Sequence, residues 1–247
     1  MKITDHVYVV ASGKLGFSFT HPLDCNVFLI DTGSGCIMID SGVNLEPERI
    51  VNVIESHGFQ PGDVKKLLLT HYHGDHAGGA AFFRNLSGCE VYAPAKEAEA
   101  IAAGDEDANS ISLSKGGFYP SDYVFPKCPV TPLYEGESVT LGNVTMKGYV
   151  LPGHSLEDMV YHGKIDGKQC LFTGDGVFAA GQVLIQSLHD VSIYPYKIHM
   201  KKISELPIDA LFPGHGVFCL ENGGDHVKAA VAKFESGLIP SQLYYFV

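Results

Sequence analysis

The sequence lacks any long apolar run. None of its 247 residues belongs to a stretch approaching the ~20 apolar residues of a membrane-spanning helix. Near the N-terminus, Asp5 and His6 interrupt the apolar residues that a secretion signal needs in one block. We therefore expect a cytoplasmic protein without a membrane partner.

Basic residues are scarce as well. Seventeen Lys and Arg stand against 28 Asp and Glu, which gives a formal net charge of −11. Such a charge repels phosphate backbones and anionic lipids, and no local basic patch offsets it. We expect no nucleic-acid partner and a small-molecule ligand instead.

The six cysteines show no C-x-x-C spacing, and the chain contains no low-complexity linker. Scattered cysteines in a chain that can bury a sizeable core are typical of reduced, mostly buried thiols. The absence of a linker predicts one domain over residues 1–247.

Apolar runs rich in β-branched residues alternate with segments of helical periodicity. Strands are expected at 6–10, 26–31, 36–42, 64–70, 90–94, 144–153, 158–163, 168–175 and 209–216, and helices at 46–59, 76–88, 194–206 and 224–237. This order predicts an α/β (α+β) protein with two packed sheets and helices on the outer faces.

Residues 105–132 form a long stretch of weak periodicity that contains Phe118, Tyr119, Tyr123 and Phe125. Such a stretch in a compact domain is typical of a lid or binding loop, although a packed surface excursion fits nearly as well. Its aromatic residues would line an apolar acyl pocket in the first case. In the second they would form a small satellite core or a homodimer contact, as would the aromatic tail at 243–246.

The stretch THYHGDHAGG at 70–79 places His71, His73, Asp75 and His76 within six positions directly after an expected strand. Imidazole and carboxylate are ligands that zinc and similar divalent metals accept. A polar loop whose histidines cap the following helix or face water is the alternative, but it leaves this density of ligands unexplained.

Three further polar residues recur in one local context. His154 in LPGHS, Asp175 in FTGDG and His215 in FPGHG each follow an expected strand beside a glycine. Taken singly, each is typical of a turn. Together with the first four they make seven potential ligands, more than one tetrahedral zinc requires.

The pattern H-x-H-x-D-H at 71–76, followed in order by His154, Asp175 and His215, resembles that of the metallo-β-lactamase-fold hydrolases. The resemblance runs from NVFLIDTGSGCIMIDSG to DALFPGHG. The members of this family include the stand-alone glyoxalase II-like and lactonase-like enzymes. The resemblance implies a four-layer αβ/βα sandwich of two mixed β-sheets with a binuclear metal centre at one edge. In this family His71, His73 and His154 would hold the first metal, Asp75, His76 and His215 the second, and Asp175 both.

Two such cations, zinc first and iron or manganese as alternatives, can share a water and lower its pKa toward ~7, giving a bridging hydroxide that attacks a carbonyl. Asp75 would orient the hydroxide and carry its proton. The chain has no G-x-S-x-G elbow that would indicate a serine hydrolase. We therefore expect a metal-dependent hydrolase of an ester, thioester or lactone.

Two other functions remain open. Persulfide dioxygenases share much of the motif but use a single iron, and a metal-binding protein without turnover is a further alternative. Within the hydrolases, related lactonases often carry a tyrosine three residues after the bridging aspartate, where this chain has Phe178. His21, His189 and Tyr194, together with Phe178, are the candidate substrate contacts, and His189 or Tyr194 is a candidate acid for the leaving group.

Overall fold

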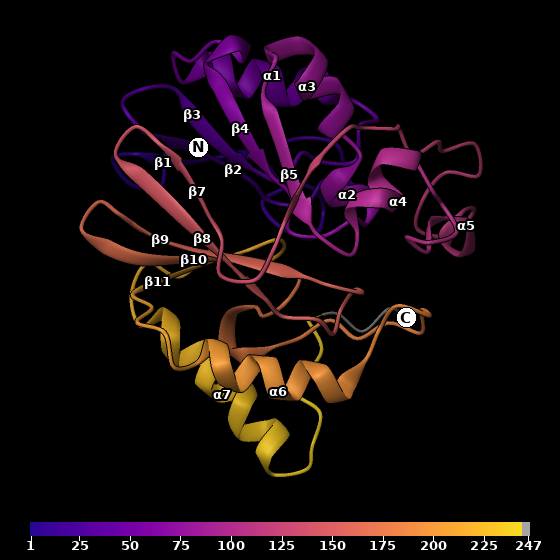
Figure 1. Ribbon diagram of the computed structural model, residues 1–247, viewed down its shortest axis with the longest axis vertical. Helices are drawn as coiled ribbons and strands as arrows, with labels where there is room; N and C mark the ends of the chain where they lie inside the picture. Colours follow the sequence, from indigo (N-terminus) through magenta and orange to yellow (C-terminus); the bar gives the residue numbers. More distant parts are fainter. Residues whose placement is uncertain (244–247) are drawn as a thin grey trace.

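The computed structural model describes residues 1–243. Two β-sheets pack face to face, and helices cover both outer faces (Figure 1). The predicted fold class, an αβ/βα sandwich, is confirmed. None of the helices in residues 1–243 is long and apolar enough to cross a membrane. Of the aromatic tail at 243–246, expected as a possible dimer contact, residues 244–246 lie outside the described residues.

The first sheet has six strands in sequence order. They are β1 (Val7–Ala11), β2 (Val27–Asp31), β3 (Cys36–Ile39), β4 (Val64–Leu68), β5 (Glu90–Pro94) and β6 (Thr131–Leu133). β1 to β3 are antiparallel, whereas β3 to β6 are parallel. The parallel strands therefore end at the same edge of the sheet.

The second sheet has five strands in the order β11-β10-β9-β8-β7. They are β7 (Ser138–Leu141), β8 (Val144–Val150), β9 (Met159–Ile165), β10 (Lys168–Gly174) and β11 (Ala210–Pro213). β7 to β10 are antiparallel, and β10 and β11 are parallel. The chain thus leaves β10 and β11 at one common edge.

The helices lie outside the sheets or at one end of the sandwich. They are α1 (Pro47–Ser56), α2 (Gly74–Ala77), α3 (Ala80–Ser87), α4 (Ala98–Ala103), α5 (Ile111–Ser114), α6 (Ile193–Ile203) and α7 (Gly223–Glu235), with 3-10 turns η1 (Pro61–Asp63) and η2 (Ala179–Gly181). α1 and α3 cover the first sheet and α6 and α7 the second, while α2, α4 and α5 lie at the end of the sandwich (Figure 1).

Alternation along the strands assigns each side chain to a layer. On β2, Phe28 and Ile30 belong to the cluster between the sheets, whereas Leu29 packs with the helices of the first sheet. On β10, Phe172 faces the other sheet and Leu171 faces the layer of α6 and α7. Because both faces of these strands are buried, they appear in the sequence as continuous apolar runs.

The prediction of one helix at 76–88 is wrong, because the structure has two helices there, α2 and α3. The interruption falls at Gly78 and Gly79, which lie against the chain that follows β3. A Cβ on Gly79 would be 2.1 Å from the carbonyl oxygen of Ser41, and one on Gly78 would be 2.7 Å from that of Val43. The close approach requires glycine and places Asp75 and His76 inside α2.

Other elements were not expected from the sequence. The short helices α4 and α5 and the edge strands β6 and β7 have only weak apolar periodicity in the sequence. β6, for example, has three residues, one of them a proline, and β7 has four. The helices α1, α6 and α7 agree with prediction within a few residues. All six cysteines are free, and five of them are buried.

Candidate metal centre

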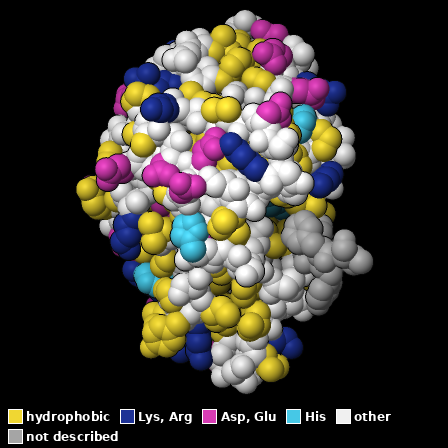
Figure 2. All heavy atoms as spheres, turned by 90° about the vertical axis from the view of Figure 1, so that its right-hand side faces the viewer, with side chains coloured by type: hydrophobic (Ala, Val, Ile, Leu, Met, Phe, Trp, Pro, Cys, Tyr) yellow, Lys and Arg dark blue, Asp and Glu magenta, His cyan; other side chains and the backbone are white. Residues whose placement is uncertain are grey.

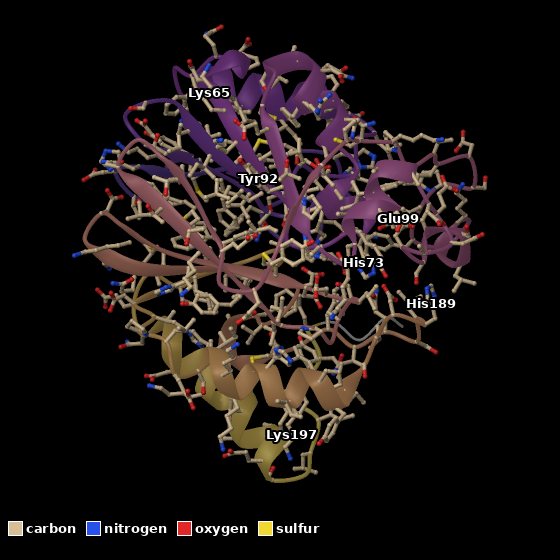
Figure 3. The ribbon with its side chains drawn as sticks, viewed as in Figure 1. Lys65, His73, Tyr92, Glu99, His189 and Lys197 are labelled. Atoms are coloured by element: carbon tan, nitrogen blue, oxygen red, sulfur yellow. The ribbon has the colours of Figure 1, made fainter. Side chains whose placement is uncertain are left out.

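Seven polar side chains meet at the end of the sandwich where the parallel strands end. They are His71 and His73 after β4, Asp75 and His76 on α2, His154 after β8, Asp175 after β10, and His215 after β11. All seven are buried. Figure 3 shows His73 where the purple half of the chain meets the orange half, with His189 farther out.

One group consists of His71, His73 and His154, each of which offers a ring nitrogen within 4.8 Å of the other two. His73 Nδ1 and His154 Nε2 are 3.0 Å apart. This spacing brings three imidazoles around one point, as a first metal would require.

A second group consists of Asp75, His76 and His215. Asp75 Oδ2 lies 3.1 Å from His215 Nε2 and 3.6 Å from His76 Nε2. Asp175 lies between the two groups, because its carboxylate oxygens are 3.5 Å from His154 Nε2, 3.3 Å from His76 Nε2 and 3.4 Å from His215 Nε2.

The donor set fits divalent metal ions. Within residues 1–243, His71 Nε2, His76 Nε2 and Asp175 Oδ1 are buried without a hydrogen-bond partner. An unpaired buried polar atom costs free energy, and three of them facing one another are explained by metal ions bound at the two donor groups, with Asp175 shared between them. His71, His76 and Asp175 also form a donor group of their own within 4.8 Å.

The charges of the site favour a cation. Burial raises the pKa of Asp75, but the charges of His76 and His215 outweigh it and lower the pKa to about 2. For His76, burial acts to lower the pKa, yet Cys25, Asp175 and Asp75 raise it well above the usual value. A positive charge is therefore stabilised between the two carboxylates. In contrast, burial and the neighbouring imidazoles lower the pKa of His71, which leaves its ring neutral and able to bind metal.

Glycine is required beside the bridging aspartate. A Cβ on Gly214 would be 2.6 Å from Asp175 Oδ1 and 2.6 Å from His76 Cε1. Gly174 has φ +48°, and a Cβ there would be 2.5 Å from Thr70 Oγ1. The glycines of FTGDG and FPGHG thus allow the two strand ends to approach each other and the site.

Residues outside the motif hold the histidines. His73 Nε2 lies 3.0 Å from Asp190 Oδ2, which also accepts from the Tyr72 hydroxyl at 3.0 Å. His76 Nδ1 lies 2.9 Å from Asp40 Oδ2. Metal-binding histidines usually donate their second N–H to a carboxylate, which fixes the ring.

Sequence reasoning missed both carboxylates. Asp40 follows the strand CIMI, so the pattern of a polar residue after a strand signals it. Asp190 lies in an irregular segment and carries no local signal. Ser110, from the 105–132 stretch, donates to Asp190 Oδ1 at 3.1 Å.

The 105–132 stretch lies at the end of the molecule that faces the viewer in Figure 2, and its aromatic side chains pack into the protein. Tyr119, Tyr123 and Phe125 belong to the core cluster of the first sheet, and Phe118 is partly buried against it. The Tyr119 hydroxyl donates to Asp75 Oδ1 at 3.0 Å, and burial and the charge of Asp75 raise the pKa of Tyr119 well above its usual value. A core role for these aromatics therefore fits the packing. That the stretch acts as a lid stays a prediction.

The candidate substrate contacts lie in different surroundings. Phe178 is fully buried, and Tyr194, in the first turn of α6, is 75% exposed. His21 is half-buried, and its Nδ1 accepts from the backbone of Leu23. His189 is exposed, with Nδ1 3.1 Å from Ser110 Oγ. Their roles toward substrate stay predictions. On the same helix, the hydroxyl of buried Tyr196 donates to the Gly176 carbonyl and lies 3.3 Å from that of Asp175, so it supports the backbone at the bridging residue.

The sequence profile of the metallo-beta-lactamase superfamily matches residues 21–215, which include all seven donors. The chain belongs to the metallo-beta-lactamase superfamily. Its fold implies the binding of divalent metal ions, and its members include metal-dependent hydrolases.

Several curated relatives in this superfamily are similar to the chain. The lactamase-like protein nscB of Trichophyton rubrum is 26% identical over 202 residues, or 82% of this chain and 52% of that protein. The probable metallo-hydrolase YybB of Bacillus subtilis is 29% identical over 176 residues, or 70% of each. The chain spans about half the length of several curated relatives that it matches.

Solved structures of the superfamily share the fold. BJP-1, a subclass B3 metallo-beta-lactamase of Bradyrhizobium japonicum, superimposes with a TM-score of 0.73 at 23% identity, covering 96% of this chain and 91% of that one. A metallo-beta-lactamase of Cronobacter sakazakii gives a TM-score of 0.71 at 21% identity, covering 92% and 95%. Identities this low show the fold alone.

Proposed function

We propose that the chain is a binuclear metallohydrolase that cleaves an ester, thioester or lactone of a small molecule, with zinc as the metal. The observation that carries this proposal is the pair of donor groups joined by Asp175. Asp175 Oδ1 and the Nε2 atoms of His71 and His76 are buried there, and none of them has a hydrogen-bond partner within residues 1–243. The names of the relatives, which refer to lactamase-like proteins and a metallo-hydrolase, support hydrolysis at a carbonyl.

Each donor has a part in this proposal. His71, His73 and His154 would hold the first metal, Asp75, His76 and His215 the second, and Asp175 both. Bound divalent metals lower the pKa of water toward ~7 and polarise a carbonyl oxygen. The Asp75 carboxylate, ionised at neutral pH, would orient the attacking water and accept its proton.

The test begins with metal analysis of protein purified without chelator, followed by an ester, thioester and lactone panel on the same sample. We expect about two metal ions per chain and turnover of at least one class. A single iron with oxygen consumption on persulfides, and no hydrolysis, would instead assign the chain to the dioxygenases. Bound metal without any turnover would favour a non-catalytic metal-binding protein.

The Asp75→Ala variant tests the proposed role of this carboxylate. We expect a folded protein whose kcat falls by at least ~100-fold, because proton transfer and second-metal binding are both lost. The control is Asp122→Ala, which removes an exposed carboxylate from the 105–132 stretch and should keep wild-type turnover. Near-normal turnover by folded Asp75→Ala protein would refute the mechanism.

A further inference from the structure

Tyr119 is not one of the seven donors, yet it contacts one of them directly. Its hydroxyl donates to Asp75 Oδ1 at 3.0 Å, and the hydroxyl oxygen of Tyr119 accepts from the backbone N–H of Asp75 at 3.3 Å. The side chain is buried, with 5% of its surface exposed. A residue 44 positions away therefore contacts both the backbone and the side chain of Asp75.

The contact gives each carboxylate oxygen of Asp75 its own partner. Oδ1 faces the Tyr119 hydroxyl, and Oδ2 lies 3.1 Å from His215 Nε2 in the second donor group. The terminal torsion of an aspartate side chain has a broad, roughly two-fold distribution, so the carboxylate is not oriented by its own rotamer preference. A donor fixed at Oδ1 supplies that orientation.

The Tyr119 ring is itself held in place. It stacks on Tyr123, with ring centroids 5.0 Å apart and an interplanar angle of 15°. Gly74 also lies against the ring, since a Cβ there would be 3.1 Å from two carbons of Tyr119. Because the ring cannot shift without moving Tyr123 or the turn at Gly74, its hydroxyl is a fixed donor.

We infer that Tyr119 is a positioning residue, whose hydroxyl holds Asp75 Oδ1 and thereby presents Oδ2 to the second metal. This inference rests on the proposed two-metal function. The 105–132 stretch would accordingly be a part of the metal centre. Tyr119 acts through Asp75 and needs no contact with substrate.

The Tyr119→Phe variant keeps the ring and removes the hydroxyl, and Tyr123→Phe is its matched control. The Tyr123 hydroxyl donates to the carbonyl oxygen of Val43 at 2.9 Å, lies 3.4 Å from that of Gly74, and makes no hydrogen bond to any of the seven donor side chains. Metal-free protein would be titrated with zinc in competition with a chromophoric chelator. For Tyr119→Phe we expect the second binding step to weaken 10- to 100-fold, the magnitude typical of a lost partner behind a ligand, with the first step unchanged.

Catalysis and spectroscopy give independent readouts. We expect kcat of Tyr119→Phe to fall about 10-fold or more with KM within about twofold of wild type, since the hydroxyl does not touch substrate. The visible absorption of the cobalt(II)-loaded protein should change in Tyr119→Phe and remain that of the wild type in Tyr123→Phe. Thermal unfolding of both variants separates these effects from a general loss of stability.

Three other results would overturn the inference. Two binding steps of wild-type affinity and unchanged kcat in Tyr119→Phe would refute the role of Tyr119 alone. Equal losses in the two variants would show that only packing was disturbed. A single binding step in the wild type would refute the two-metal function and, with it, the role of Tyr119.

Discussion

The two donor groups of the metal centre differ in what holds them. In the first group, every imidazole has a contact behind it: His71 Nδ1 is 3.0 Å from Thr70 Oγ1, His73 Nε2 is 3.0 Å from Asp190, and His154 Nδ1 is 2.9 Å from the carbonyl oxygen of Leu184. These contacts fix all three rings before any metal binds.

The second group is held less completely. His76 has Asp40 behind it and Asp75 has Tyr119, but within residues 1–243 no hydrogen bond is made by His215 Nδ1. Preorganised ligands lose less conformational freedom when they bind. The difference therefore predicts that the first site binds metal more tightly than the second.

Stepwise removal of metal is the most severe test of this difference. Under graded chelator we expect the second metal to leave first and hydrolysis to fall to background at that point, because Asp75 has then lost its metal. Metal content and kcat, measured on the same dialysed samples, check this order. Simultaneous loss of both metals, or full activity with one, would contradict it.

The Asp190→Asn variant should weaken the other group. The amide oxygen of asparagine can still accept the ring proton, but it carries no negative charge to orient and polarise the imidazole, so we expect the affinity of the first site to fall 10- to 100-fold while the second step is unchanged. Asp225→Asn makes the same chemical change at an exposed residue of α7 and serves as control. Zinc titration in competition with a chelator measures both steps. A loss confined to the second step would reverse the assignment of the groups.

The seven donors could be predicted from the sequence because four of them fall within six residues directly after a strand, and the other three each follow a strand beside a glycine. Parallel strands such as β10 and β11 end at one edge, so residues that follow them in sequence converge in space. Helices with strong apolar periodicity, such as α1, were predictable for a similar reason, since local pattern and burial agree there.

The residues that hold the donors could not be predicted. Asp190 contacts His73 across 117 positions and Tyr119 contacts Asp75 across 44, and both come from irregular segments without a period to place them. Such contacts exist only once the fold has brought the segments together. The edge strand β7 was not predicted for a different reason. Its alternation of buried and exposed residues covers only four positions, which is too short to distinguish a strand from a turn.

A buried carboxyl pair lies behind the first donor group. Asp158 Oδ2 accepts from the backbone N–H of His154 and Ser155, and Glu97 Oε1 accepts from the Ser155 hydroxyl at 2.7 Å. Within residues 1–243, Glu97 Oε2 and Asp158 Oδ1 are both buried without a hydrogen-bond partner, and Asp158 Oδ1 lies 3.9 Å from His71 Nδ1. Burial and the nearby charge of Asp158 raise the pKa of Glu97 from 4.5 to about 8.

The Glu97→Gln variant isolates what this carboxyl pair contributes to the stability of the folded protein. Of the changes predicted here, it should have the smallest effect on activity. Because the folded pKa is the higher one, the folded protein binds the extra proton, and stability falls as pH rises from 4.5 to about 8. Glutamine cannot ionise, so we expect the variant to gain about 4 kcal/mol of stability over the wild type between pH 5 and pH 9, at about 1.36 kcal/mol per pKa unit. Glu99→Gln, at an exposed position of α4, is the control. Parallel stability curves for wild type and Glu97→Gln, measured by denaturant unfolding from pH 5 to pH 9, would show that Glu97 is ionised in the folded protein.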